Sequence, residues 1–76
     1  MKLPVVDSKI IIKILEMKGF EKIGQSGSHV QFKNNKGNII TVPVHPGRDI
    51  GPGLLRKIIR DLELSREDFI GLVEHT

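Results

Sequence analysis

The strongest constraint on the fold comes from two short segments, residues 27–33 and 38–44, in which apolar side chains recur at every second position. These apolar residues are Val30, Phe32, Ile40, Val42 and Val44. Alternation with a period of two is typical of a β-strand that buries one face. The segments therefore predict two strands whose even-numbered residues face a common core.

The turn between these segments sets their register. The linking sequence Asn-Asn-Lys-Gly is typical of a hairpin. Even-numbered residues of the two strands can pair with each other only if the loop between them has an odd number of residues. A three-residue loop that ends with Gly37 in the left-handed conformation meets this condition. We therefore expect Val30 to face Val42, and Phe32 to face Ile40.

The same register places His29, Gln31 and Lys33 together on the opposite, polar face of the sheet. His29 is then expected opposite Pro43 and one diagonal step from His45. Diagonal neighbours in an antiparallel pair lie about 7–8 Å apart, so the two histidines are close enough to share a site.

The rest of the chain predicts helices and one further strand. Asp7 or Ser8 is a suitable N-cap for a helix that runs to about Lys18, and Gly19 is a suitable terminator. A strand follows near residues 21–25, with a turn at 24–27. Gly51 and Pro52 suit the start of a second helix, and Ser65-Arg66-Glu67-Asp68 suits the capping box of a short helix over 65–73. The apolar stripes of the three helices are Ile11, Ile14 and Leu15; Leu55, Ile58, Ile59 and Leu62; and Phe69, Leu72 and Val73.

We therefore predict one α+β domain over residues 1–76, with a core at about 8–65 and the element order α-β-β-β-α-α. Its helices should cover one face of a three-stranded meander.

The sequence has no cysteine, which excludes disulfides and thiolate zinc sites and suits the cytoplasm. Its longest apolar run is residues 10–12, far too short for a transmembrane or signal segment, so we expect no membrane association.

Charge is distributed unevenly along the chain. Residues 1–60 contain 11 Lys and Arg against four acidic residues, a balance of +7, whereas residues 61–76 contain one Arg against five acidic residues, a balance of −4. The basic part favours a polyanionic partner such as RNA. The alternative is an ordinary solvated surface.

The histidines are the candidates for chemistry. A histidine on a polar sheet face can act as a general acid or base, although it can also be a surface residue without a role. A metal site is a third interpretation, but two histidines with only Asp49 as a nearby carboxylate make a poor one. We therefore predict neither a metal nor another cofactor.

The start of the second helix is a candidate phosphate site, because its first backbone N–H groups lack helical partners. Arg48 precedes this start, and Arg56 and Lys57 follow it. The alternative is that Gly-Pro-Gly is only a turn and a cap. The chain has no Trp or Tyr, and its Phe residues fall at core positions, so a stacking platform for bases is not expected.

Four sequence motifs together resemble the HicA family of bacterial and archaeal toxins, over roughly residues 8–65. In order, they are Gly19-Phe20, Gln25-x-Gly27-Ser28-His29, Val42-Pro43-Val44-His45, and Gly53-x-Leu55-Arg56-x-Ile58. One departure is Leu54, where many members carry threonine.

This resemblance implies a fold like that of the double-stranded-RNA-binding domain and the activity of a ribosome-independent mRNA interferase. It also implies neutralisation by a HicB antitoxin. The catalytic histidine of the family matches His29. As assisting residues we predict Ser28, its neighbour in the chain, and His45, one diagonal step away. The RNA-binding residues that we predict are Gln31, Lys33, Arg48, Arg56, Lys57 and Arg60. A non-catalytic RNA-binding module and an inactive partner-binding scaffold are the competing classes.

Overall fold

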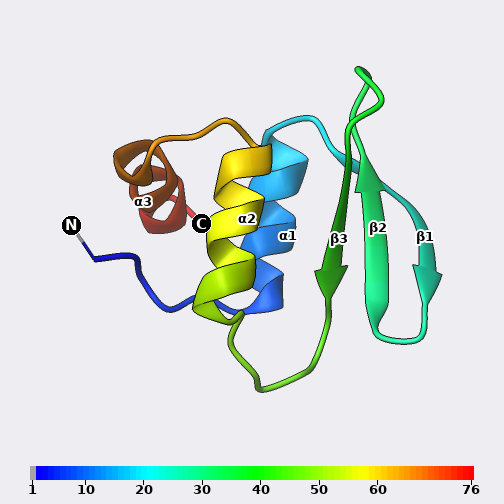
Figure 1. Cartoon of the computed structure of the whole chain (residues 1–76), viewed down its shortest axis with the longest axis horizontal. Coiled ribbons are helices and arrows are strands. Elements are labelled where there is room, and N and C mark those ends of the chain that lie inside the picture. Colours follow the sequence, from blue (N-terminus) through cyan, green and yellow to red (C-terminus); the bar gives the residue numbers. More distant parts are fainter. Residues whose placement is uncertain (1) are drawn as a thin grey trace.

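A computed structural model describes residues 2–76, and its elements follow the predicted order. They are α1 (Ser8–Met17), β1 (Glu21–Ser26), β2 (His29–Lys33), β3 (Ile39–Pro43), α2 (Pro52–Asp61) and α3 (Arg66–Glu74). Figure 1 shows three layers: the sheet, then α1 and α2 against one of its faces, then α3 on the side of these helices away from the sheet. Within residues 2–76, no helix covers the other face of the sheet, and the β2 residues on that face are exposed.

The β2–β3 register is the predicted one. Val30 pairs with Val42 and Phe32 with Ile40, and all four side chains are buried. The loop of three residues between Asn34 and Asn38 ends at Gly37, which has a φ of 88°. Its geometry is reinforced by the side-chain Oδ1 of Asn34, which accepts hydrogen bonds from the backbone N–H groups of Lys36 at 3.1 Å and Asn38 at 2.9 Å.

Strand β1 is the irregular edge of the sheet. Its pairing with β2 is interrupted by a bulge between Lys22 and Gly24, and its residues are exposed apart from the half-buried Gly24. The bulged residue, Ile23, leaves 53% of its surface exposed. Bulges at sheet edges limit further strand pairing, so this edge is poorly suited to adding another strand.

Helix α1 is capped at both ends. Asp7 is its N-cap, and its Oδ1 accepts a hydrogen bond from the backbone N–H of Ile10 at 3.0 Å. At the other end, the N–H of Phe20 donates to the carbonyl of Leu15 at 2.9 Å, and the N–H of Gly19 donates to that of Glu16 at 3.1 Å. This pair of bonds is a Schellman motif, and it requires the left-handed φ of 86° at Gly19.

The core is continuous between the sheet and the helices. The predicted stripes of α1 and α2 are buried, including Leu62 directly after α2. Helix α3 contacts α1 and contributes the fully buried Phe69, while Leu72 and Val73 pack at the edge of the core. Ser65 caps α3 as predicted, since its Oγ accepts a hydrogen bond from the N–H of Asp68 at 3.0 Å.

The segment before α1 is part of the packed structure, which the sequence analysis did not predict. Val6 has only 1% of its surface exposed. Its carbonyl accepts a hydrogen bond from the N–H of Ile50 at 2.8 Å, and Asp7 forms a β-bridge with Asp49. The N-terminal segment therefore fastens the loop between β3 and α2.

We predict opposite stability effects for two Gly→Ala substitutions. Gly19→Ala should lower the free energy of unfolding by about 1–2 kcal/mol, because an L-residue is strained at a positive φ. Gly71→Ala, within α3, should raise it by about 0.5–1 kcal/mol through helix propensity. An added Cβ has no neighbouring atom within 4 Å at either position, so the expected difference in stability does not come from a steric clash. Urea denaturation of both variants measures the difference, and effects of the same sign would contradict this account of the cap.

Candidate functional site

His29 lies on the open face of the sheet. It is the first residue of β2, pairs with Ser26 of β1 and Pro43 of β3, and is exposed. Among residues 2–76, the structure gives its side chain neither a hydrogen bond nor an ion pair. An imidazole placed in this way is accessible to a substrate and is not engaged in holding the fold together.

His45 and Arg48 are placed by a turn after β3. The N–H of Arg48 donates to the carbonyl of His45 at 3.0 Å, and Gly47 between them has a φ of 76°. Pro46 and Gly47 occupy the central positions of this turn, as a type II turn prefers. The turn thus returns the chain toward α2 and places an arginine next to His45.

A shallow hollow of about 240 Å³ lies at the start of α2. The residues that line it are Pro43, His45, Arg48, Asp49, Ile50, Gly51 and Leu54. Gly51, the N-cap of α2, supplies no side-chain hydrogen bond, and the first turn has no acidic residue. The N-terminal N–H groups of α2 therefore retain their capacity to bind an anion. Leu54, the departure from the family pattern, brings an apolar side chain into this hollow.

The two histidines approach the same end of the sheet, but only His45 lines the hollow. Strand pairing extends one residue past β3, where the N–H of Val44 donates to the carbonyl of Ser28 at 2.7 Å. His45 follows this last pair and belongs to the loop. Figure 1 shows the start of β2, the end of β3 and the start of α2 together at the lower end of the molecule.

Gln31 and Lys33 share the open face with His29, as predicted, and both are exposed. Lys33 stands at the far end of β2, roughly 13 Å from His29 at about 3.3 Å per residue. Next to it, Ile39 of β3 exposes 55% of its surface. This face therefore combines polar, cationic and apolar groups along its length.

The cations of α2 are distributed over several surfaces, and Arg60 lines a hollow together with Ile39 of this face. Arg56 lines a groove between α2 and the N-terminal segment, and Arg60 lines hollows toward β3 and toward α3. Lys57 makes an ion pair with Asp61 at 3.3 Å. The roles of Arg56, Lys57 and Arg60 in RNA binding stay predictions. The sequence analysis did not predict this groove, which residues 2–5 help to line. The sequence feature that pointed to it was the group of apolar residues around Pro4.

Two exclusions apply to the described residues, 2–76. They contain no group of three or more His, Cys, Asp or Glu residues that could hold a metal ion. None of their helices is both long and apolar enough to cross a membrane.

Comparison with known families identifies the chain. The sequence model described as "HicA toxin of bacterial toxin-antitoxin" matches residues 8–64. This chain belongs to the HicA toxin family. The match spans α1 to the end of α2 and includes His29, His45 and the start of α2, whereas α3 lies beyond it. Family membership makes this HicA protein a toxin of a toxin–antitoxin pair, with a partner antitoxin. No curated protein gives a significant match.

We predict that the two faces of the β2–β3 hairpin differ in their importance for stability. His29→Ala should change the free energy of unfolding by no more than about 0.5 kcal/mol, because the side chain is exposed and unbonded. Ile40→Ala should cost about 2–5 kcal/mol, because it leaves a cavity against the helices. Urea denaturation followed by circular dichroism measures both. A large loss of stability in His29→Ala would make this residue structural.

Proposed function

We propose that this HicA protein is a metal-independent endoribonuclease that cleaves mRNA, with His29 as its proton-transferring group. The observation that carries the proposal is an exposed histidine on the open face of the sheet, whose strand partner Pro43 lines a hollow with Arg48 and the uncapped start of α2. The family match and the resemblance of the Gly27-Ser28-His29 motif support it.

The reaction requires one general base and one general acid, and histidine side chains can supply both. The ribose 2′-hydroxyl attacks the adjacent phosphorus and loses its proton to a base, while the 5′-oxygen of the next nucleotide leaves and takes a proton from an acid. The products are a 2′,3′-cyclic phosphate and a free 5′-hydroxyl. An imidazole can serve as either the acid or the base. His29 performs one of these transfers, and His45 and Ser28 are the nearest candidates to assist it.

RNA binding in this proposal uses charge and backbone contacts. Arg48 and the N–H groups at the start of α2 suit a phosphate, since both supply hydrogen-bond donors to negatively charged oxygens. Gln31 and Lys33 extend the contact along β2. Among the described residues, Phe20, Phe32 and Phe69 are all buried, so no phenylalanine ring is open for a base to stack on.

The antitoxin is proposed to be a HicB-like protein that covers the same open face. Among the residues that the structure describes, no helix lies over that face, and it presents the half-exposed Ile39 beside Lys33. A partner with apolar and acidic groups would match it. A toxin inhibited in this way is inactive because its histidine is inaccessible.

We predict that His29→Ala lowers the rate of RNA cleavage by about 10²–10⁴, the usual contribution of a general acid or base. RNA affinity should remain nearly unchanged, because cations dominate binding. Growth arrest in cells expressing the variant should disappear. His45→Ala should have a smaller effect. The measurement is cleavage of a long RNA by the purified proteins, with end-group analysis for the cyclic phosphate.

Two controls separate the alternatives. Activity that persists in EDTA supports metal-independent chemistry, whereas its abolition would revive a metal mechanism. Equal rates for wild type and His29→Ala would remove His29 from the mechanism. RNA binding without cleavage by the wild-type protein would indicate a binding module, and failure to bind RNA would indicate a partner-binding scaffold.

We also predict that antitoxin and RNA compete. If both occupy the open face, adding the antitoxin should displace a labelled RNA from the toxin, measured by fluorescence anisotropy. Changing Lys33 to Glu should weaken both interactions, because it places a negative charge on the shared surface. Lys36→Glu, in the hairpin loop, makes the same charge change as a control. A ternary complex with unchanged RNA affinity would place the antitoxin elsewhere.

A further inference from the structure

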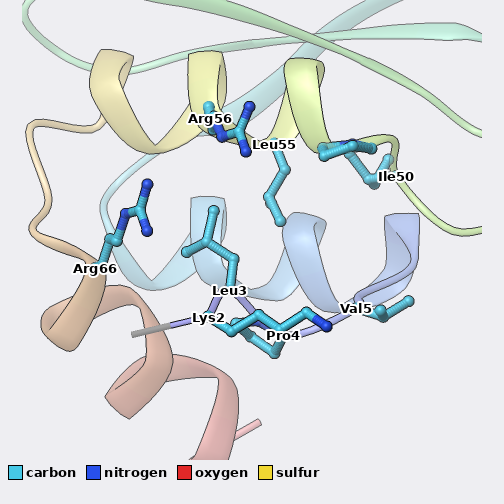
Figure 2. Close-up of a pocket in the computed structure, with 9 residues that line it drawn as sticks. Lys2, Leu3, Pro4, Val5, Ile50, Leu55, Arg56 and Arg66 are labelled. Atoms are coloured by element: carbon cyan, nitrogen blue, oxygen red, sulfur yellow. The ribbon is translucent and has the colours of Figure 1, made fainter.

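A groove on the other side of the molecule has no role in the proposed cleavage. It runs between α2 and the N-terminal segment, has a volume of about 300 Å³ and is shown in Figure 2. An adjoining groove of about 470 Å³ continues along α2 toward α3 and shares Leu3, Arg56 and Arg66 with the first. Neither groove is lined by His29 or His45, so together they form a surface separate from the open sheet face.

Most of the residues that line this combined groove are apolar, and together they are called its floor. Its apolar lining residues come from the N-terminal segment, from the loop before α2 and from α2 and its C-terminal extension; they are Leu3, Pro4, Val5, Ile50, Pro52, Leu55, Ile59 and Leu64. Val5 exposes 76% of its surface, and Leu3 is half-buried. Exposed apolar side chains gathered in a concave surface are typical of a site that binds another molecule.

The charged residues that line the combined groove are called its rim, and most of them are cationic. Lys2, Arg56, Arg60 and Arg66 line it, against the single acidic residue Glu63. Figure 2 shows the guanidinium groups of Arg56, from α2, and Arg66, from α3, near Leu3. Arginine favours carboxylate partners because its planar N–H groups match the two oxygens.

We propose that this groove binds an acidic, amphipathic segment of a partner protein. Apolar side chains of the segment occupy the floor, and its carboxylates contact the arginines of the rim. RNA fits less well, because a phosphate backbone gains nothing from a floor of Leu, Ile and Pro. Among residues 2–76, no aromatic ring lines the groove for a base to stack on. The proposal goes beyond the proposed ribonuclease function and does not depend on it.

The test uses the full chain and two synthetic probes. One is a 12-residue peptide that combines leucines at helical spacing with glutamates, and the other has the leucines replaced by serines. In a ¹⁵N NMR titration of the wild-type protein, the leucine peptide should shift the amide signals of Leu3, Val5, Leu55, Arg56 and Arg66. The signals of β2 should remain in place, and the serine peptide should cause little change.

A matched pair of variants tests the charge of the rim. Arg56→Glu should weaken binding of the leucine peptide by at least about tenfold, because it converts an attractive contact into a repulsive one. Lys13→Glu makes the same charge change on the exposed surface of α1, outside the groove, and should alter affinity by less than about twofold. The NMR titration does not depend on these variants, so it stands if one of them folds poorly.

Three results would overturn the proposal. Equal binding of the two peptides would show that the apolar floor is not used. Equal effects of Arg56→Glu and Lys13→Glu would reduce the interaction to general charge attraction. An RNA oligonucleotide that shifts the same amide signals and displaces the leucine peptide would assign the groove to nucleic acid.

Discussion

The pairing of β2 with β3 is the constraint on which the rest of the structure depends. Val30 and Phe32 face Val42 and Ile40 against α1 and α2, so the neighbouring residues His29, Gln31 and Lys33 must face outward. A slip of one residue would exchange the two faces, exposing the apolar set and burying a histidine and a lysine. The same strand register that buries the core residues therefore also exposes the candidate site to solvent.

The N-terminal segment connects the two surfaces described above. Through the carbonyl of Val6 and the bridge at Asp7, its backbone holds the loop that leads into α2, which carries His45 and Arg48. Through Leu3, Pro4 and Val5, its side chains line the arginine-rimmed groove. The same short segment therefore contacts both the loop that carries His45 and Arg48, through its backbone, and the groove, through its side chains.

The basic residues of α2 point to different surfaces of the molecule because of the geometry of the helix. Its buried stripe of Leu55, Ile58 and Ile59 faces the core, so its cations must spread around the remaining surface of the helix. Arg56 falls toward the N-terminal segment, whereas Lys57 pairs with Asp61. Cations that are close together in the sequence of α2 therefore lie on more than one surface. The cation beside His45 comes from the loop instead, and it is Arg48.

Local patterns in the sequence determined the elements, the caps at Gly19 and Ser65, the three-residue hairpin loop and the side of β2 on which His29 lies, and they restricted the first N-cap to Asp7 or Ser8. These features depend on side-chain periodicity and on backbone conformations within a few residues, which the sequence displays directly. The tertiary structure alone decided how distant segments meet. It buried Val6 beneath the loop before α2, joined residues 2–5 to α2 and α3 in a groove, and placed Arg56 away from the open sheet face. Such contacts depend on the packing of whole layers against one another, and no local pattern records which residues that packing brings together.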